Sequence, residues 1–249
     1  MSLATSLSRP HRAIVELGML ASLYALYEVA RGAGDASLAV ARDHTSDIVG
    51  LERSLHVFSE RAVQEWSHSI PYLPAFLGLA YMSLHLGATA LAVRWVYRER
   101  RHAFPIVRTT LIASTALALI GYVLYPAAPP RLSGLGFSDT VTTHTGLNLS
   151  SDLLGSFYNP LAAVPSLHFG YALIVGVALA VLARRPWVRI VGALYPPFML
   201  FDIVATANHF WFDAAAGGLT VVAGWWLASA LVRERQRSRP APRLRPLAV

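Results

Sequence analysis

Three short stretches of the chain contain residues whose types and spacing could do phosphate chemistry. "NHFWFD" (208–213) places His209 four residues before Asp213. On a helix this spacing puts both side chains on one face, so the carboxylate can hold the Nδ1 proton of the histidine and leave Nε2 as a nucleophile. "VPSLHFG" (164–170) contains a second histidine, His168. Because histidines exchange protons and attack phosphorus near neutral pH, the two predict proton transfer and nucleophilic catalysis.

The same stretches offer ways to bind phosphate. "YPAAPPR" (125–131) ends in Arg131, whose planar guanidinium can donate two parallel hydrogen bonds to phosphate oxygens. Pro165 and Ser166 fit a helix start with Ser166 as N-cap, and the free N–H groups of such a first turn bind anions. The three stretches form one site only if the fold brings them together.

The composition is that of a polytopic membrane protein. The chain is 55% hydrophobic and 14% charged, whereas soluble domains average about 25% charged residues. A bilayer-crossing helix needs about 20 apolar residues. We therefore predict an all-α fold with six transmembrane helices near residues 13–31, 72–97, 106–126, 167–183, 188–209 and 213–232. The fifth can instead end before Asn208, so that "NHFWFD" opens the sixth. No cleavable signal peptide is expected, because the first apolar segment is too long and lacks a cleavage site of small residues.

The arginines predict the orientation. Sixteen of the 21 lie on one side of the predicted spans and five on the other. The richer side holds Arg9, Arg12, Arg94, Arg98, Arg100, Arg101, Arg108, Arg184, Arg185, Arg189, Arg233, Arg235, Arg237, Arg239, Arg243 and Arg245. By the positive-inside rule both termini are cytoplasmic, and all three motif stretches lie on the extracytoplasmic side of the plasma (cytoplasmic) membrane.

The segments outside the spans allow further predictions. Apolar residues recur at helical spacing between residues 46 and 67, which predicts an amphipathic helix in the membrane interface. Residues 1–232 are expected to form a single transmembrane catalytic domain. The basic tail, 233–249, is expected to be disordered, cytoplasmic and able to touch anionic lipid.

A polar stripe leads inward from the second histidine motif. Asp202, Thr206, His209 and Asp213 would share one helical face if the segment is continuous. Charged groups at membrane depth are costly and face a bundle interior or a wet cavity, so we expect Asp202 to support the site. His85 and Tyr81 form another pair four residues apart, which we interpret as packing or cavity lining.

Composition also excludes some chemistry. The chain has no cysteine, which excludes disulfides and thiolate sites, and all 21 basic residues are arginine, which excludes a catalytic lysine. The net charge of +7 is explained by the membrane topology, so nucleic acid is not expected as a partner. We expect no cofactor and no metal, because the nearby carboxylates are too few for magnesium and the histidines have other roles.

In order, spacing and common side, the three motifs resemble those of the type 2 phosphatidic acid phosphatase superfamily. "PSLH" (165–168) resembles its second motif, Pro-Ser-Gly-His, and "HFWFD" (209–213) resembles its third, His-x-x-x-Asp. The Tyr-Pro…Pro-Pro-Arg stretch ahead of Pro-Ser-Leu-His is most similar to the inositol phosphorylceramide synthase-like (inositolphosphotransferase) branch. The layout is similar over roughly residues 50–230, and the specific residues are confined to the three motifs.

The chain also departs from the family pattern. The first motif usually carries a lysine ahead of Arg-Pro, whereas here no lysine exists and Leu132 follows Arg131. The third usually has an arginine six residues before its histidine, where this chain has Ile203. Two phosphate-binding cations of the phosphatase pattern are thus missing, which favours lipid phosphotransfer over hydrolysis of small phosphomonoesters.

The resemblance implies a metal-independent membrane phosphatase or phosphotransferase. His209, oriented by Asp213, would attack phosphorus and form a phosphohistidine, and His168 would protonate the leaving oxygen and then deprotonate the acceptor. Arg131 and the amides near Ser166 would hold the phosphate. The partners would be a lipid phosphate or phospholipid substrate, the bilayer, and a polyol or lipid acceptor. The alternative is a transporter or lipid-binding scaffold that uses the polar cavity without turnover.

Overall fold

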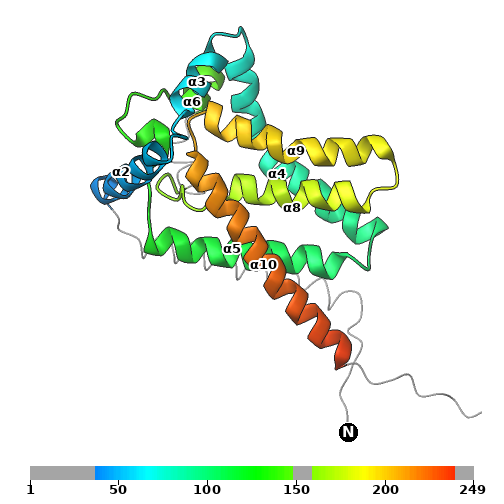
Figure 1. Cartoon of the computed structure of the whole chain (residues 1–249). Helices are drawn as coiled ribbons and strands as arrows, with labels where there is room; N and C mark the ends of the chain where they lie inside the picture. Colours follow the sequence, from blue (N-terminus) through cyan, green and yellow to red (C-terminus); the bar gives the residue numbers. More distant parts are fainter. Residues whose placement is uncertain (1–36, 148–158, 239–249) are drawn as a thin grey trace, which may run out of the picture.

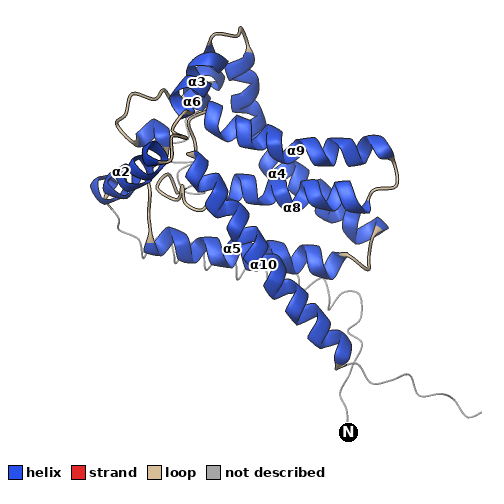
Figure 2. Ribbon diagram, in the orientation of Figure 1, coloured by secondary structure: helices blue, strands red, loops and turns tan. Residues whose placement is uncertain are grey.

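The long apolar runs of the sequence form the long helices of the protein, and a computed structural model describes residues 37–147 and 159–238. The long helices are α4 (Leu73–Glu99), α5 (Phe104–Leu124), α8 (Leu167–Leu182), α9 (Pro186–Ala205) and α10 (Trp211–Arg237). Within those ranges all regular structure is helical, apart from one isolated bridge between Ala127 and Ala162 (Figure 2). The predicted all-α class is therefore confirmed for this part of the chain.

Four of these helices, α4, α5, α9 and α10, are long and apolar enough to cross a membrane. α8 is apolar but has 16 residues, so it is about 24 Å long against a hydrocarbon core of about 30 Å. Helices thus occur at five of the six predicted spans, and the first, at 13–31, lies outside the described residues.

Close backbone contact at glycine holds the long helices together. α8 packs mainly against α9, and α10 against α5 (Figure 1). Where α8 crosses α9, a Cβ on Gly192 would meet the Leu179 Cβ at 2.6 Å, closer than real Cβ atoms come. Only a glycine lets these helices approach so closely.

The short elements gather at one end of the long helices (Figure 1). They are α2 (Leu38–Ser54), α3 (Glu60–His68), the 3₁₀ turn η1 (Pro130–Leu132) and α6 (Thr140–Thr145), and we call this the site end. The α4–α5 and α8–α9 turns share the opposite, arginine end, where Arg100 Nε donates to the Leu182 carbonyl over 2.7 Å. The structure therefore brings together two of the arginine-rich segments.

Two boundaries differ from the sequence predictions. The single amphipathic helix expected at 46–67 is wrong, because α2 ends at Ser54 and α3 begins at Glu60, with His56 between them at φ 59°. Such a positive φ interrupts a right-handed helix. The basic tail also begins later than predicted, since α10 continues to Arg237.

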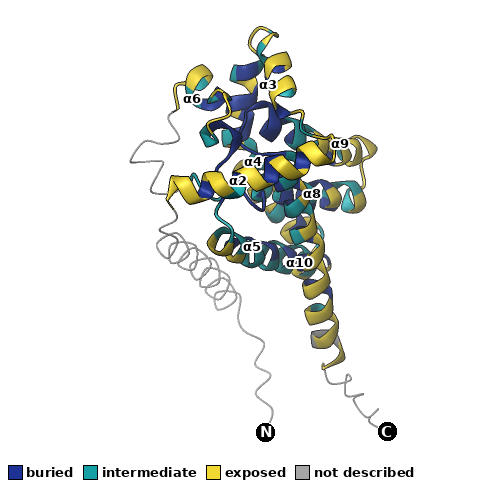
Figure 3. Ribbon diagram, turned by 60° about the vertical axis from the view of Figure 1, so that its left-hand side comes forward, coloured by how far each residue is buried: buried dark blue, intermediate teal, exposed yellow. Residues whose placement is uncertain are grey.

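The two short helices turn an unexpected side inward. Both helices have buried and exposed residues along their length (Figure 3). Glu52 of α2 and Glu60 of α3 are buried, whereas Leu55 and Trp66, two of the apolar residues at helical spacing between 46 and 67, are exposed. The exposed sides are nevertheless not purely apolar, because α2 exposes Arg42 and Asp47 and buries Ile48.

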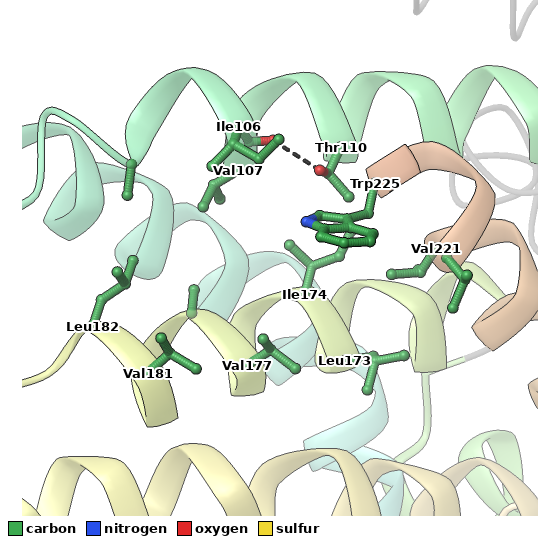
Figure 4. A pocket seen from close by; sticks show the side chains of 13 residues that line it. Ile106, Val107, Thr110, Leu173, Ile174, Val177, Val181, Leu182, Val221 and Trp225 are labelled. Carbon is green, nitrogen blue, oxygen red and sulfur yellow. Dashed lines mark hydrogen bonds between the residues drawn. The ribbon is translucent and has the colours of Figure 1, made fainter. Parts of the chain in front are cut away.

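An apolar groove runs between α5 and α8 toward the arginine end. Figure 4 shows Val107 and Thr110 of α5 facing Ile174 and Val177 of α8, with Trp225 of α10 beside them. The cavity measures about 480 Å³, and its lining is almost entirely hydrocarbon. The polar groups of the motif stretches lie elsewhere, at the site end.

Candidate active site

The third motif lies at the junction of α9 and α10. α9 ends at Ala205, Ala207 has φ 56°, and the amide of His209 turns back to donate to the Ile203 carbonyl over 3.1 Å. α10 then begins at Trp211. The continuous helical face running from Asp202 to Asp213 is therefore wrong, and the alternative in which the fifth helix ends before Asn208 is confirmed.

The break still brings His209 and Asp213 together. His209 Nδ1 lies 3.2 Å from Asp213 Oδ2, and the same oxygen accepts the Phe210 amide over 2.9 Å. His209 is 5% exposed and Asp213 fully buried. Asp213 therefore caps the first turn of α10 and orients the histidine that precedes it, an arrangement stabilised by the positive end of the helix dipole.

The second motif forms the start of α8, beside the start of α10. Ser166 is the N-cap, as predicted, and its hydroxyl oxygen accepts the Phe169 amide over 3.3 Å. Its own amide donates to the Asp213 carbonyl over 2.9 Å, and a Cβ on Gly217 would overlap the Ser166 carbonyl oxygen. The N-termini of two helices thus meet, and both present positive dipole ends to the same place.

This meeting places the two histidine rings near each other, with centroids 5.7 Å apart. On its other side, His168 is stacked against two rings of α4. The Tyr81 ring lies 4.2 Å away at an interplanar angle of 12°, and the His85 ring lies 4.0 Å away at 29°. Their spacing of four residues predicted a shared helix face and a role in packing or cavity lining, and the sequence contained no signal that this face meets His168.

The first motif places Arg131 beside the third. Its backbone amide donates to the Ala207 carbonyl over 3.0 Å, and its Nε donates to Asn208 Oδ1 over 3.0 Å. A guanidinium nitrogen lies 3.7 Å from Asp139 Oδ2, and the side chain is fully buried. Asn208, which the motifs did not single out, thus holds the arginine directly beside His209.

Asp202 takes a different position. It is fully buried in the last turn of α9, and neither carboxylate oxygen has a hydrogen-bond partner among the described residues. Its backbone carbonyl accepts the Thr206 hydroxyl over 2.7 Å. This bond ties Asp202 to the turn that follows α9 and leads to His209.

A metal site is the other arrangement that such side chains could form. Within residues 37–147 and 159–238, no three His, Asp or Glu side chains are grouped so that they could hold an ion. What the site does contain is one buried cation, a histidine–carboxylate pair, a second histidine and two helix N-termini. This set suits an anionic, phosphate-like group.

Fold and site together define an integral membrane protein whose buried charged side chains, among the described residues, gather at one end of an apolar helix bundle. A family model, the PAP2 superfamily, matches residues 46–227, and the chain belongs to that superfamily. This confirms the resemblance to the type 2 phosphatidic acid phosphatases seen in the motifs. The match extends from α2 through most of α10 and so includes all three motif stretches.

A curated relative supports the inositol phosphorylceramide synthase-like branch. The chain is 22% identical over 183 residues to a phosphoinositol dihydroceramide synthase of Bacteroides thetaiotaomicron. The alignment covers 66% of this chain and 57% of that relative, so the chain spans little more than half of its length. No solved structure matches the chain.

Proposed function

We propose that this protein is a membrane lipid phosphatase or phosphotransferase that works through a phosphohistidine on His209. The observation that carries the proposal is the buried pair of His209 and Asp213, with the ring of His168 5.7 Å away, in a member of the PAP2 superfamily. A nucleophile held by a carboxylate beside a second acid–base group is the arrangement that covalent phosphoryl transfer requires.

The substrate is a phosphorylated lipid or a lipid-linked headgroup. Its phosphate is held by Arg131 and by the amides of Leu167 and His168, which precede the first intrahelical hydrogen bond of α8, from Gly170 to Ser166. Asn208 and Asp139 orient the guanidinium from behind. Asp202 supports the site from within α9.

The reaction has two steps. His209 Nε2 attacks phosphorus and the bond from phosphorus to the leaving oxygen breaks, while His168 gives its proton to that oxygen. His168 then takes a proton from the acceptor, whose oxygen attacks phosphorus and breaks the bond to Nε2. Asp213 holds the Nδ1 proton and balances the positive charge that develops on the ring.

The acceptor decides the product. Water would give free phosphate, and an alcohol on a polyol or a second lipid would give a transferred headgroup. The name of the relative, phosphoinositol dihydroceramide synthase, and the absence of two phosphatase-type cations in the motifs support transfer.

We propose that the site end faces away from the cytoplasm, supported by the arginines of the α4–α5 and α8–α9 turns at the other end. Because the chain has no cysteine, single cysteines report on sidedness. In intact cells an impermeant maleimide should label Ser54→Cys and spare Arg101→Cys. The reverse labelling would contradict this orientation.

Turnover of phosphorus-labelled substrate tests the reaction. Purified protein in detergent with chelator is given mixed lipid phosphates and phosphodiester lipids, with and without a polyol such as inositol. We expect label to move with wild type and not with His209→Ala. His102→Ala, a histidine exposed at the arginine end, is the matched control and should behave as wild type.

The products separate the alternatives. Free labelled phosphate indicates hydrolysis and labelled acceptor indicates transfer. Activity that depends on an added divalent ion would contradict the metal-independent mechanism. If wild type moves no label from any substrate, the result favours the alternative of a transporter or scaffold. The next measurement is then the flux of labelled lipid across vesicle membranes.

A further inference from the structure

Two buried glutamates lie outside all three motifs and touch the third. Glu52 of α2 is 2% exposed and Glu60 of α3 fully buried. Glutamate is almost never so buried unless its carboxylate is paired. Their partners are backbone amides of α10, 160 and 151 residues further along the chain.

Together with Asp213, the two glutamates cap the start of α10. Glu60 Oε1 accepts the Trp211 amide over 3.1 Å, and Glu52 Oε1 accepts the Phe212 amide over 2.7 Å. Asp213 Oδ2 accepts the preceding amide, that of Phe210. Three successive amides, which a helix cannot satisfy internally, thus donate to carboxyl groups from three different helices.

The remaining oxygens of the two glutamates require a proton. Glu52 Oε2 and Glu60 Oε2 are buried, and no N–H or O–H group of the described residues donates to them. The two carboxyl groups bind the successive amides of Trp211 and Phe212, and a hydrogen bond between their free oxygens needs a hydrogen that two carboxylates lack. One shared proton satisfies both oxygens and leaves the pair with a single negative charge at the positive end of α10.

We propose that Glu52 and Glu60 are positioning residues, a carboxyl pair holding one proton that sets the position of His209 and Asp213 through the amides of Trp211 and Phe212. The proposal rests on the function proposed above, because it assigns the pair a role in the same reaction. The indole of Trp211 reinforces the contact, since its Nε1 donates to Ser59 Oγ over 3.0 Å.

The surroundings of the pair make it sensitive to pH. The charge of Asp213 in α10 acts on Glu52, and His209 lies 3.2 Å from Asp213. On the exposed side lie Arg53, whose guanidinium is over the Phe58 ring, and His56. Burial, and next the hydrogen bond from Glu60, raise the pKa of Glu52 from 4.5 to about 9.

The sign of the pH effect follows. The folded protein keeps the proton of Glu52 where the unfolded chain has released it, so this group makes the protein less stable as the pH rises from 4.5 to about 9. Near and above the upper limit the pair loses its proton, and two carboxylates repel each other beside Asp213. We expect kcat to fall there while KM changes little.

Glutamine and alanine variants separate positioning from mere packing. Glu52→Gln and Glu60→Gln keep an amide-accepting oxygen and replace the shared proton by an N–H donor. At pH 7 they should retain kcat within about threefold, and Glu52→Gln should lose the alkaline fall. Glu52→Ala and Glu60→Ala should lower kcat about 10- to 100-fold at similar KM, because the catalytic groups are displaced. Glu65→Gln, exposed on α3, is the control.

Measurements without turnover keep the pair testable if the proposed reaction fails. The wild-type minus Glu52→Gln infrared difference spectrum at pH 7 should contain the carboxylic C=O stretch of a buried acid. The unfolding temperature of Glu52→Gln should exceed that of wild type increasingly from pH 5 to pH 9. Amide exchange in residues 208–213 should speed up in the alanine variants.

Each result decides the proposal. Absence of the infrared band, or a wild-type pH profile in Glu52→Gln, would overturn the shared proton. The positioning role would be overturned if the alanine variants fold and keep the wild-type kcat. If no substrate turns over, it would be overturned by a wild-type rate of amide exchange in residues 208–213 of these variants. If wild type turns over no substrate but the infrared band, the trend in unfolding temperature and the amide exchange are as expected, only the proposed reaction is contradicted.

Discussion

The two sides of the candidate site hold their histidines by different forces. On the α10 side, His209 Nδ1 is hydrogen-bonded to Asp213 Oδ2 over 3.2 Å, and the same oxygen accepts the Phe210 amide at the start of the helix. On the α4 side, His168 is stacked at about 4 Å against Tyr81 and His85.

The difference matches what each histidine is proposed to do. A carboxylate at Nδ1 sets one tautomer and aims the other nitrogen, which a nucleophile needs. Stacking fixes the plane of a ring and uses neither nitrogen, so a ring held in this way can give and take protons in turn. The comparison therefore predicts unequal costs for disturbing the two sides.

The largest effect is expected on the α10 side, for Asp213→Asn. Asp213 Oδ2 binds both His209 Nδ1 and the Phe210 amide, so the asparagine oxygen either keeps both contacts or leaves both facing its NH₂ group. In either orientation the negative charge that balances the imidazolium is lost. We expect kcat to fall about 10³- to 10⁴-fold, as when a catalytic histidine loses its carboxylate. Single-turnover trapping of phosphoenzyme measures this, and a folded variant that keeps a tenth of the wild-type rate would contradict it.

His168→Ala is expected to cost less, about 10²- to 10³-fold with lipid substrates, the usual contribution of a general acid. The loss should shrink for a nitrophenyl phosphate, whose leaving oxygen needs no proton. Asp213→Asn should show no such recovery. Equal recovery in both variants would erase the distinction between nucleophile and acid.

Arg131→Ala should act mainly on binding. The loss of charged hydrogen bonds, at about 1.5–3 kcal/mol, corresponds to about a 10- to 100-fold fall in kcat/KM. Arg131→Lys should recover part of it, and Arg61→Ala, an exposed arginine of α3, is the matched control. Steady-state kinetics over a range of lipid concentration decide the point, and an unchanged KM would argue against phosphate binding.

The smallest effect is expected for the stacked rings. His85→Ala removes one of the two rings stacked on His168, about 0.5–1.5 kcal/mol, so kcat should fall about 2- to 10-fold. His85→Phe keeps the stacking and should stay closer to wild type. If His85→Phe were as slow as His85→Ala, the imidazole of His85 would itself take part in proton transfer. Stacking alone would then not describe how the α4 side acts on His168.

Several features could be predicted because they depend on neighbours along the chain. Apolar runs of membrane length predicted helices at 72–97 and 106–126, and the helices begin at Leu73 and Phe104. Pro165 and Ser166 predicted a helix start, and Ser166 caps α8. Helix periodicity and capping operate within about four residues, so a single stretch of sequence contains them.

The predictions that were wrong failed where distant contacts override local pattern. The spacing of residues 46–67 is helical throughout, yet the chain breaks after Ser54 and lets Glu52 and Glu60 reach different amides of α10. The stripe from Asp202 to Asp213 is likewise interrupted after Ala205, where Asn208 and His209 turn toward Arg131 and Asp213.

The amino-acid sequence by itself determined the membrane class, the positions of the long helices and the residue types of the three motifs. Only the tertiary structure decided that Arg131 is buried against Asn208, that α4 supplies rings to His168, and that Glu52 and Glu60 close the start of α10. The physical reason is that hydropathy and helix periodicity are local sums along the chain. A buried charge, in contrast, must find its partners wherever the packed helices bring them, here from as far as 160 residues away.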